Sequence, residues 1–109
     1  MNIERGLVTT SLGYMHYRAA GTVGKQAIFL QHINQQSSAL YLELMAVLCP
    51  SLRVVAMDYP SHGGSDHVEQ QPTIGAYARC VTDVADALGI QKFSVLGEAV
   101  GAAVSIELA

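Results

Sequence analysis

The chain has 109 residues, a length typical of one small domain or of part of a larger one. Half of the residues are hydrophobic, 14% are charged and the net charge is −3. This composition argues against a disordered tail, and the six thinly spread Lys and Arg residues argue against a nucleic-acid-binding surface. We expect neither a membrane span, which needs roughly 18 apolar residues, nor a secretory signal.

The two cysteines, Cys49 and Cys80, form no CxxC motif and are too few for a disulfide framework. We expect them to be reduced and mostly buried thiols. This cysteine usage favours a cytoplasmic protein.

The first thirty residues favour strands. Leu7–Thr10 and Tyr14–Tyr17 are short β-favouring runs separated by a turn at Ser11–Gly13, which predicts an antiparallel hairpin. Ala27–Leu30 is a continuous apolar run, as expected of a strand that is buried on both faces of a parallel sheet.

A helix is predicted after Ser38, where the apolar period changes from two to about 3.6 residues. Ser37 or Ser38 is the expected N-cap, and Pro50 ends the helix. The predicted buried face consists of Leu40, Leu44, Val47 and Leu48.

A second buried strand is predicted at Arg53–Met57, followed by the turn-rich segment Asp58–Asp66. Thr73 is the expected cap of a second helix that ends at Gly89. Its apolar residues at helical spacing are Ile74, Tyr77, Ala78, Val81, Val84, Ala85 and Leu88.

A third strand is predicted at Phe93–Leu96, followed by a glycine-flanked turn at Gly97–Gly101 and a third helix. This alternation predicts an α/β fold with a mostly parallel sheet, helices on both faces and an N-terminal antiparallel hairpin. The third helix is still apolar at Ala109, so we expect residues 1–109 to be an incomplete domain whose last strand lies at an open edge. A small natural domain of this size is the alternative.

Three predicted loops follow the carboxyl ends of the parallel strands, where open α/β sheets build their sites. In all three the chain resembles the α/β-hydrolase family. Phe29–His32 resembles the strand and His that open the family's oxyanion loop, and Asp58–Asp66 resembles its D-x-P-G-H-G-x-S-D loop. Val95–Ala102 resembles the strand, nucleophile elbow and helix start. Order and spacing match the first half of that fold over essentially the whole chain.

The resemblance departs from the family at the centre of the elbow, where Ala99 stands in place of the usual nucleophile. Gly97 and Gly101 still remove the side chains that a sharp strand-to-helix turn would bring into collision. A methyl group cannot attack a carbonyl, so we expect the chain as written to be inactive through this turn. Glu98 is the candidate substrate-contacting residue, with a polar neighbour of the site as the alternative.

The resemblance implies an oxyanion hole built from backbone N–H groups. One is the Val100 N–H at the positive end of the third helix, and the other comes from the loop of His32, Ile33 and Asn34. Ile33 stands where the family usually has Gly, and a β-branched residue disfavours positive φ. We therefore expect this loop to depart from the family's path.

The resemblance places the catalytic His and acid after the elbow. We therefore expect His32 and His62 to have structural or oxyanion-loop roles, and His16 and His67 to be surface residues. Ser65 is expected to bond its own turn. No spacing suggests a metal site, and Gly97–Gly101 lacks the middle glycine of GxGxxG, so we expect no metal and no cofactor.

Three functional hypotheses follow from these residues. The first is a hydrolase of esters or related carbonyl compounds (an esterase, lipase or C–C hydrolase by resemblance) whose nucleophile is replaced by Ala99. The second is an inactive relative that binds a small apolar ligand or a partner protein. The third is a non-hydrolytic enzyme that uses a His further along the gene product. The sequence carries no signal for oligomeric state.

Overall fold

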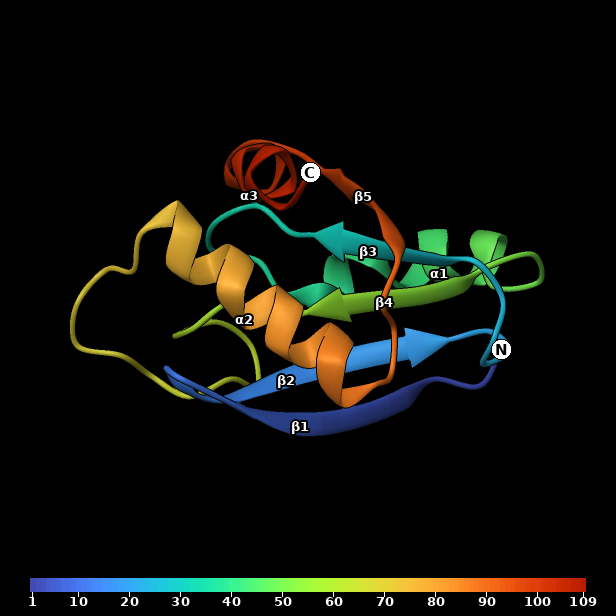
Figure 1. Ribbon diagram of the computed structural model, residues 1–109, viewed down its shortest axis with the longest axis horizontal. Coiled ribbons are helices and arrows are strands. Elements are labelled where there is room, and N and C mark those ends of the chain that lie inside the picture. The colour runs from blue at the N-terminus through green and yellow to red at the C-terminus, as the bar shows by residue number, and fades with distance from the viewer.

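The computed structural model describes residues 1–109 and contains one five-stranded sheet of order β1-β2-β4-β3-β5 (Figure 1). Only β2 runs against the other strands, because it pairs antiparallel with β1 and β4 whereas β3 pairs parallel with β4 and β5. This confirms the predicted sheet and hairpin. The strands are β1 (Glu4–Thr10), β2 (Gly13–Ala20), β3 (Ala27–Gln31), β4 (Arg53–Met57) and β5 (Phe93–Gly97).

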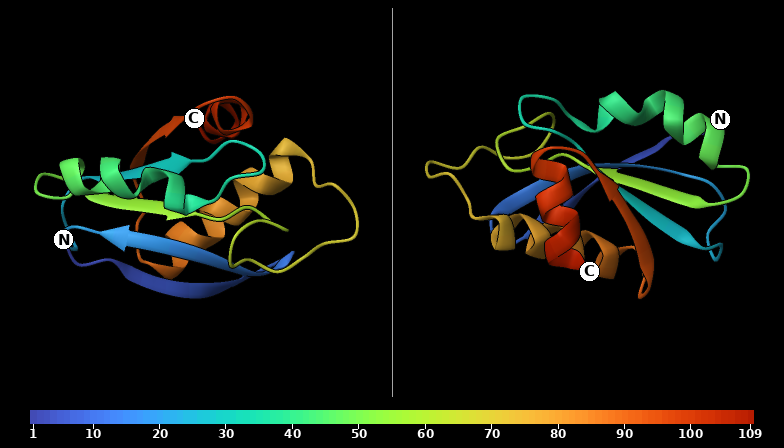
Figure 2. Two further views of the ribbon diagram at one scale, coloured as in Figure 1. Left: turned by 180° about the vertical axis from the view of Figure 1, so that it is seen from behind. Right: turned by 90° about the horizontal axis from the view of Figure 1, so that it is seen from above.

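The helices cover both faces of the sheet, as predicted. A 3₁₀ turn, η1 (Ser38–Tyr41), leads into α1 (Leu42–Leu48) on one face. The helices α2 (Ile74–Ala87) and α3 (Val100–Leu108) lie together on the opposite face (Figure 2).

The strand β3 is buried on both sides. Phe29 belongs to the core beneath α2 and α3, whereas Leu30 belongs to the core beneath α1. Each such side chain contributes about 1.5–3 kcal/mol of hydrophobic stabilisation. The apolar run at Ala27–Leu30 therefore marks the central strand that both cores share.

The ends of α2 are set by the residues that the sequence indicates. The Thr73 hydroxyl accepts a hydrogen bond from the Ala76 N–H at 3.0 Å, which caps the first turn. Gly89 has a φ of 73°, the left-handed conformation that ends many helices. Both predicted ends are confirmed.

The predicted buried face of α1 is confirmed at Leu44 and Leu48, which pack partly buried against the core, and wrong at Leu40 and Val47. Leu40 and Val47 are 42% and 73% exposed, whereas Tyr41 and Met45 are buried. The first turn is a 3₁₀ turn capped by Ser37, with three residues per turn, and this shifts the phase of the helix that follows. The Tyr41 hydroxyl also donates to the Gln31 carbonyl at 2.9 Å, which anchors this face to β3.

The strand β5 forms one edge of the sheet, as expected, because it pairs only with β3. Leu96 on this strand and Ile106 on α3 are 41% and 77% exposed.

Both cysteines are free; Cys80 is buried and Cys49 is half-buried. No helix has the length and apolarity needed to cross a membrane.

Candidate active site

The order of the strands identifies where a site can form. From β3 the chain passes to β4 on one side and then crosses to β5 on the other. The loops after β3 and β5 therefore leave toward opposite faces, toward α1 and α3, and such a switch point is where open α/β sheets form a ligand-binding crevice. In Figure 1 these carboxyl ends and the loop after β4 lie at the same end of the sheet, which we call the carboxyl edge.

Backbone strain is concentrated at this edge. Three residues other than glycine have positive φ: Gln35 at 65°, Ser61 at 66° and Ala99 at 55°. One lies in the loop after each of the three parallel strands. Such conformations cost about 1–3 kcal/mol each and are characteristic of functional loops.

Ala99 occupies a sharp turn between β5 and α3. Its φ of 55° and ψ of −123° belong to a region that glycine normally occupies. The Gly101 N–H donates to the Glu98 carbonyl at 2.9 Å, and the Ala102 N–H donates to the Ala99 carbonyl at 3.0 Å. These bonds close the turn and leave the Ala99 side chain exposed.

Two glycines allow this turn to lie close to β3. A β-carbon at position 97 would overlap the Gly101 carbonyl, and one at position 101 would overlap the Gln31 carbonyl. The second glycine also lies close to the next residue of the β3 loop, since its β-carbon would stand 3.0 Å from the His32 carbonyl oxygen. Both positions therefore exclude any larger residue.

The predicted oxyanion residues lie in the loop after β3 and at the start of α3. Val100 is the first residue of α3, and its N–H takes no part in the hydrogen bonds that close the turn. Ile33 and Asn34 follow β3, whose last residue Gln31 pairs with Gly97. The left-handed residue of this loop is Gln35, so Ile33 avoids the positive φ that its branched side chain disfavours.

His32 joins the loops after β3 and β4 and is fully buried. Its Nε2 accepts the Tyr59 N–H at 3.1 Å, and its Nδ1 lies 2.6 Å from the Ile33 carbonyl, to which it donates. Burial lowers the pKa of His32, with a smaller opposing effect from the Ile33 carbonyl. A neutral ring with both nitrogens bonded holds the two loops together.

Asp58, the first residue after β4, forms hydrogen bonds that join this loop to β2 and to the start of η1. Its carboxylate accepts hydrogen bonds from the Ser38 N–H at 2.6 Å, the Gly64 N–H at 2.9 Å and the His16 Nδ1 at 2.8 Å. Burial alone would raise the pKa of Asp58, but these hydrogen bonds together lower it below its usual value. The Ser65 hydroxyl adds a bond to the Asp58 carbonyl at 2.7 Å, as predicted for a turn serine.

The expectation that His16 is a surface residue is wrong, since it is only 6% exposed. Its Nδ1 donates to Asp58, and its Nε2 accepts from the Arg5 Nε at 3.0 Å. The partner is 42 positions away in the sequence, so the alternation of the strand could not reveal it. His67, in contrast, is exposed as predicted.

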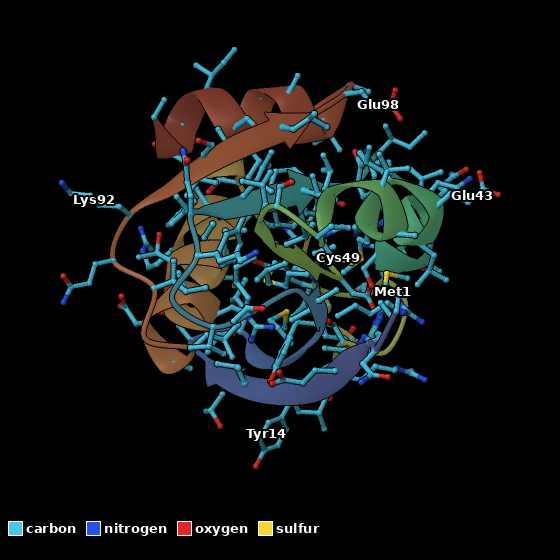
Figure 3. The ribbon with its side chains drawn as sticks, turned by 90° about the vertical axis from the view of Figure 1, so that its right-hand side faces the viewer. Met1, Tyr14, Glu43, Cys49, Lys92 and Glu98 are labelled. Carbon is cyan, nitrogen blue, oxygen red and sulfur yellow. The ribbon has the colours of Figure 1, made fainter.

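Glu98 is exposed, and its side chain points outward from the turn (Figure 3). Sequence reasoning did not identify the buried polar groups beneath the edge. The Gln31 amide, the Tyr59 hydroxyl and the Ser105 hydroxyl are buried without a hydrogen-bond partner. The only signal in the sequence was a polar residue, Gln31, at the end of an apolar strand.

No group of three or more His, Cys, Asp or Glu side chains could hold a metal ion.

No family model matches the chain. An uncharacterized protein of Mycobacterium tuberculosis is 29% identical over 93 residues, which are 85% of this chain and 27% of that protein. The same figures hold for an uncharacterized protein of Mycobacterium bovis. The chain thus spans about a quarter of the length of these curated relatives.

Solved structures share the fold closely. A proline iminopeptidase-related protein of Thermus thermophilus is 28% identical with a TM-score of 0.87, and the match covers 99% of this chain and 40% of that one. A carboxylesterase of Bacillus subtilis is 24% identical with a TM-score of 0.88 over 99% of this chain and 38% of that one. An enol-lactonase of Burkholderia xenovorans is 23% identical with a TM-score of 0.90, and the match covers 95% of this chain and 41% of that one. The chain has the α/β-hydrolase fold and corresponds to its N-terminal part.

Proposed function

We propose that residues 1–109 form the N-terminal, incomplete part of an α/β-hydrolase domain for esters or related carbonyl compounds, in which Ala99 occupies the nucleophile position. The observation that carries this proposal is the left-handed backbone of Ala99 between β5 and α3. This strained turn displays a side chain at the sheet edge, and alanine gains nothing from such a conformation. It is the geometry that a nucleophile elbow needs.

A serine at position 99 would attack the substrate carbonyl with its Oγ. The negative charge that develops on the carbonyl oxygen would be stabilised by the Val100 N–H at the start of α3 and by a donor from the Ile33–Asn34 loop. Water would then release the acyl group. In the family the base and acid that serve this serine follow the elbow in the chain, and we assign them to the remainder of a longer protein.

As written, the chain lacks the reacting oxygen. Removing the nucleophile from a serine protease lowers turnover about 10⁶-fold. We therefore expect no covalent hydrolysis through Ala99. His32 does not substitute for the missing group, because both of its ring nitrogens are already bonded.

The methyl group of Ala99 also supports a second candidate function. A hydrolase-like protein without a nucleophile would bind a small apolar ligand or a protein partner at the crevice and leave it unchanged. A ligand at 100 times its dissociation constant would stabilise the fold by about 2.7 kcal/mol without any product. Two free thiols support a cytoplasmic location for either function.

The experiment is Ala99→Ser in the complete gene product, assayed with p-nitrophenyl acetate. We expect a burst of p-nitrophenol followed by turnover, both absent from the Ala99 protein. Ala103→Ser is the matched control, because it places the same hydroxyl in the first turns of the same helix. Equal rates for the two variants would refute the hydrolase proposal. Ligand-induced stabilisation with no product from either variant would then favour the binding protein.

A further inference from the structure

A pocket of about 340 Å³ lies within the loop after β4, outside the crevice described above. One wall is formed by Pro60–His62 and the other by His67–Pro72, with Tyr77 of α2 between them. Only two of the ten lining residues are hydrophobic. The pocket therefore offers polar side chains to a ligand beside apolar surface.

The two walls are held together by hydrogen bonds. The Ser61 hydroxyl accepts the Val68 N–H at 2.9 Å, and the Ser61 N–H donates to the Asp66 carbonyl at 2.8 Å. On the other side the Gln71 amide donates to the Tyr77 hydroxyl at 2.8 Å. Ser61 maintains this arrangement in spite of its positive φ, so the pocket is formed before a ligand binds.

A continuous series of contacts joins this pocket to the turn that carries Ala99. The ring of His62 lies 5.2 Å from the ring of His32, measured between centroids. His32 in turn lies against the first turn of α3, where only glycine fits at position 101. Because His32 is fully buried, it separates the pocket from this turn.

Two lining side chains, His62 and Glu69, can accept hydrogen bonds from a ligand. The His62 Nδ1 lies 2.9 Å from the Pro60 carbonyl. A carbonyl can only accept, so Nδ1 carries a proton, and in the corresponding neutral tautomer the lone pair lies on Nε2. Glu69 is exposed and forms no ion pair, and neither Lys nor Arg lines the pocket. The only carboxylate among the lining side chains is that of Glu69.

We propose that this pocket binds a protonated amine, held by the Glu69 carboxylate and by Nε2 of His62. The inference goes beyond the proposed function, because it assigns a separate binding site for a cationic ligand in the loop after β4.

The test is a titration of the unaltered chain, followed by the backbone amide shifts of its ¹H–¹⁵N spectrum at low ionic strength. The probes are butylammonium, 1-butanol and butyrate, which share one carbon chain and differ in charge. We expect saturable shifts centred on residues 60–72, with butylammonium binding at least about tenfold more tightly than butyrate. Glu69→Gln should weaken butylammonium binding about three- to tenfold and leave 1-butanol unchanged.

Glu43→Gln is the matched control, because Glu43 is an exposed carboxylate on α1 at the opposite face of the sheet. It should leave all three affinities unchanged. Equal binding of the three probes, shifts centred elsewhere, or equal effects of the two substitutions would overturn the proposal. The unaltered chain keeps Ala99, so this result is independent of hydrolysis by Ala99→Ser, and failure of one proposal is distinguishable from failure of the other.

Discussion

Gly101 lies so close to Gln31 that a β-carbon on the glycine would overlap the Gln31 carbonyl oxygen. This contact fixes the first turn of α3 against the end of β3 and thereby brings together the loops that follow β3 and β5. The position of Ala99 depends on it.

We predict that Gly101→Ala lowers the free energy of unfolding by about 2–4 kcal/mol, because backbone has to move to admit the methyl group. Urea denaturation measures this change. Gly75→Ala, in the first turn of α2, is the control: a β-carbon there meets nothing nearer than 3.8 Å. It should instead stabilise the chain by up to about 1 kcal/mol. A Gly101→Ala variant as stable as the unaltered chain would show that the contact is not tight.

Ala99→Gly should stabilise the chain by about 1 kcal/mol. Glycine adopts the φ of 55° without the strain that a β-carbon suffers, although it also gains entropy in the unfolded state. Ala103→Gly, inside α3, should have the opposite sign and cost about 0.5–1 kcal/mol. Thermal unfolding of the two variants checks both signs. Destabilisation by Ala99→Gly would contradict the strained turn.

Asp58→Asn should destabilise the chain by about 2–4 kcal/mol. The NH₂ group that replaces one carboxylate oxygen can only donate hydrogen bonds. The side chain can therefore no longer accept all three bonds, from the Ser38 N–H, the Gly64 N–H and His16. Asp86→Asn is the control, because Asp86 is exposed on α2 and should change stability by less than about 0.5 kcal/mol. Similar losses in the two variants would mean that the network contributes little.

The free energy of unfolding should also fall as the pH is lowered. Burial lowers the pKa of His32 in the folded chain, so its contribution is fully present above the unfolded value of about 6.5 and is lost as the pH falls below it. The slope is at most about 1.4 kcal/mol per pH unit. The pKa of Asp58 is also lowered, which adds a second loss as the pH falls below about 3.9.

Urea denaturation between pH 8 and pH 5 measures the first of these effects. His32→Gln should reduce the slope below pH 6.5, whereas His67→Gln, at an exposed position, should leave it unchanged. An unaltered slope in His32→Gln would show that the buried ring is not responsible.

Local features of the fold could be predicted from the sequence because they depend on neighbouring residues. Arg53–Met57 forms β4 with the predicted boundaries, and Thr73 and Gly89 delimit α2 as predicted. The strand-turn-helix around Ala99 was visible because Gly97 and Gly101 flank it. Each of these signals lies within a few residues of the structure that it determines.

The features that could not be predicted depend on distant contacts. His16 can be buried because Asp58, 42 positions away, accepts a hydrogen bond from its Nδ1. Val47 is exposed because a 3₁₀ turn rotates the face of α1. The strain at Gln35 and Ser61 has no local signature, since neither residue is glycine. The polar pocket beside His62 forms only when the loop closes through Ser61 and Val68.

The most direct measurement of the central claim is the intact mass of the complete gene product carrying Ala99→Ser after reaction with a fluorophosphonate. We predict one covalent adduct, located on Ser at position 99 by peptide mapping, and none on the unaltered protein or on Ala103→Ser. A folded Ala99→Ser protein that stays unlabelled, or is labelled only at another residue, would contradict the assignment of this turn as a nucleophile position.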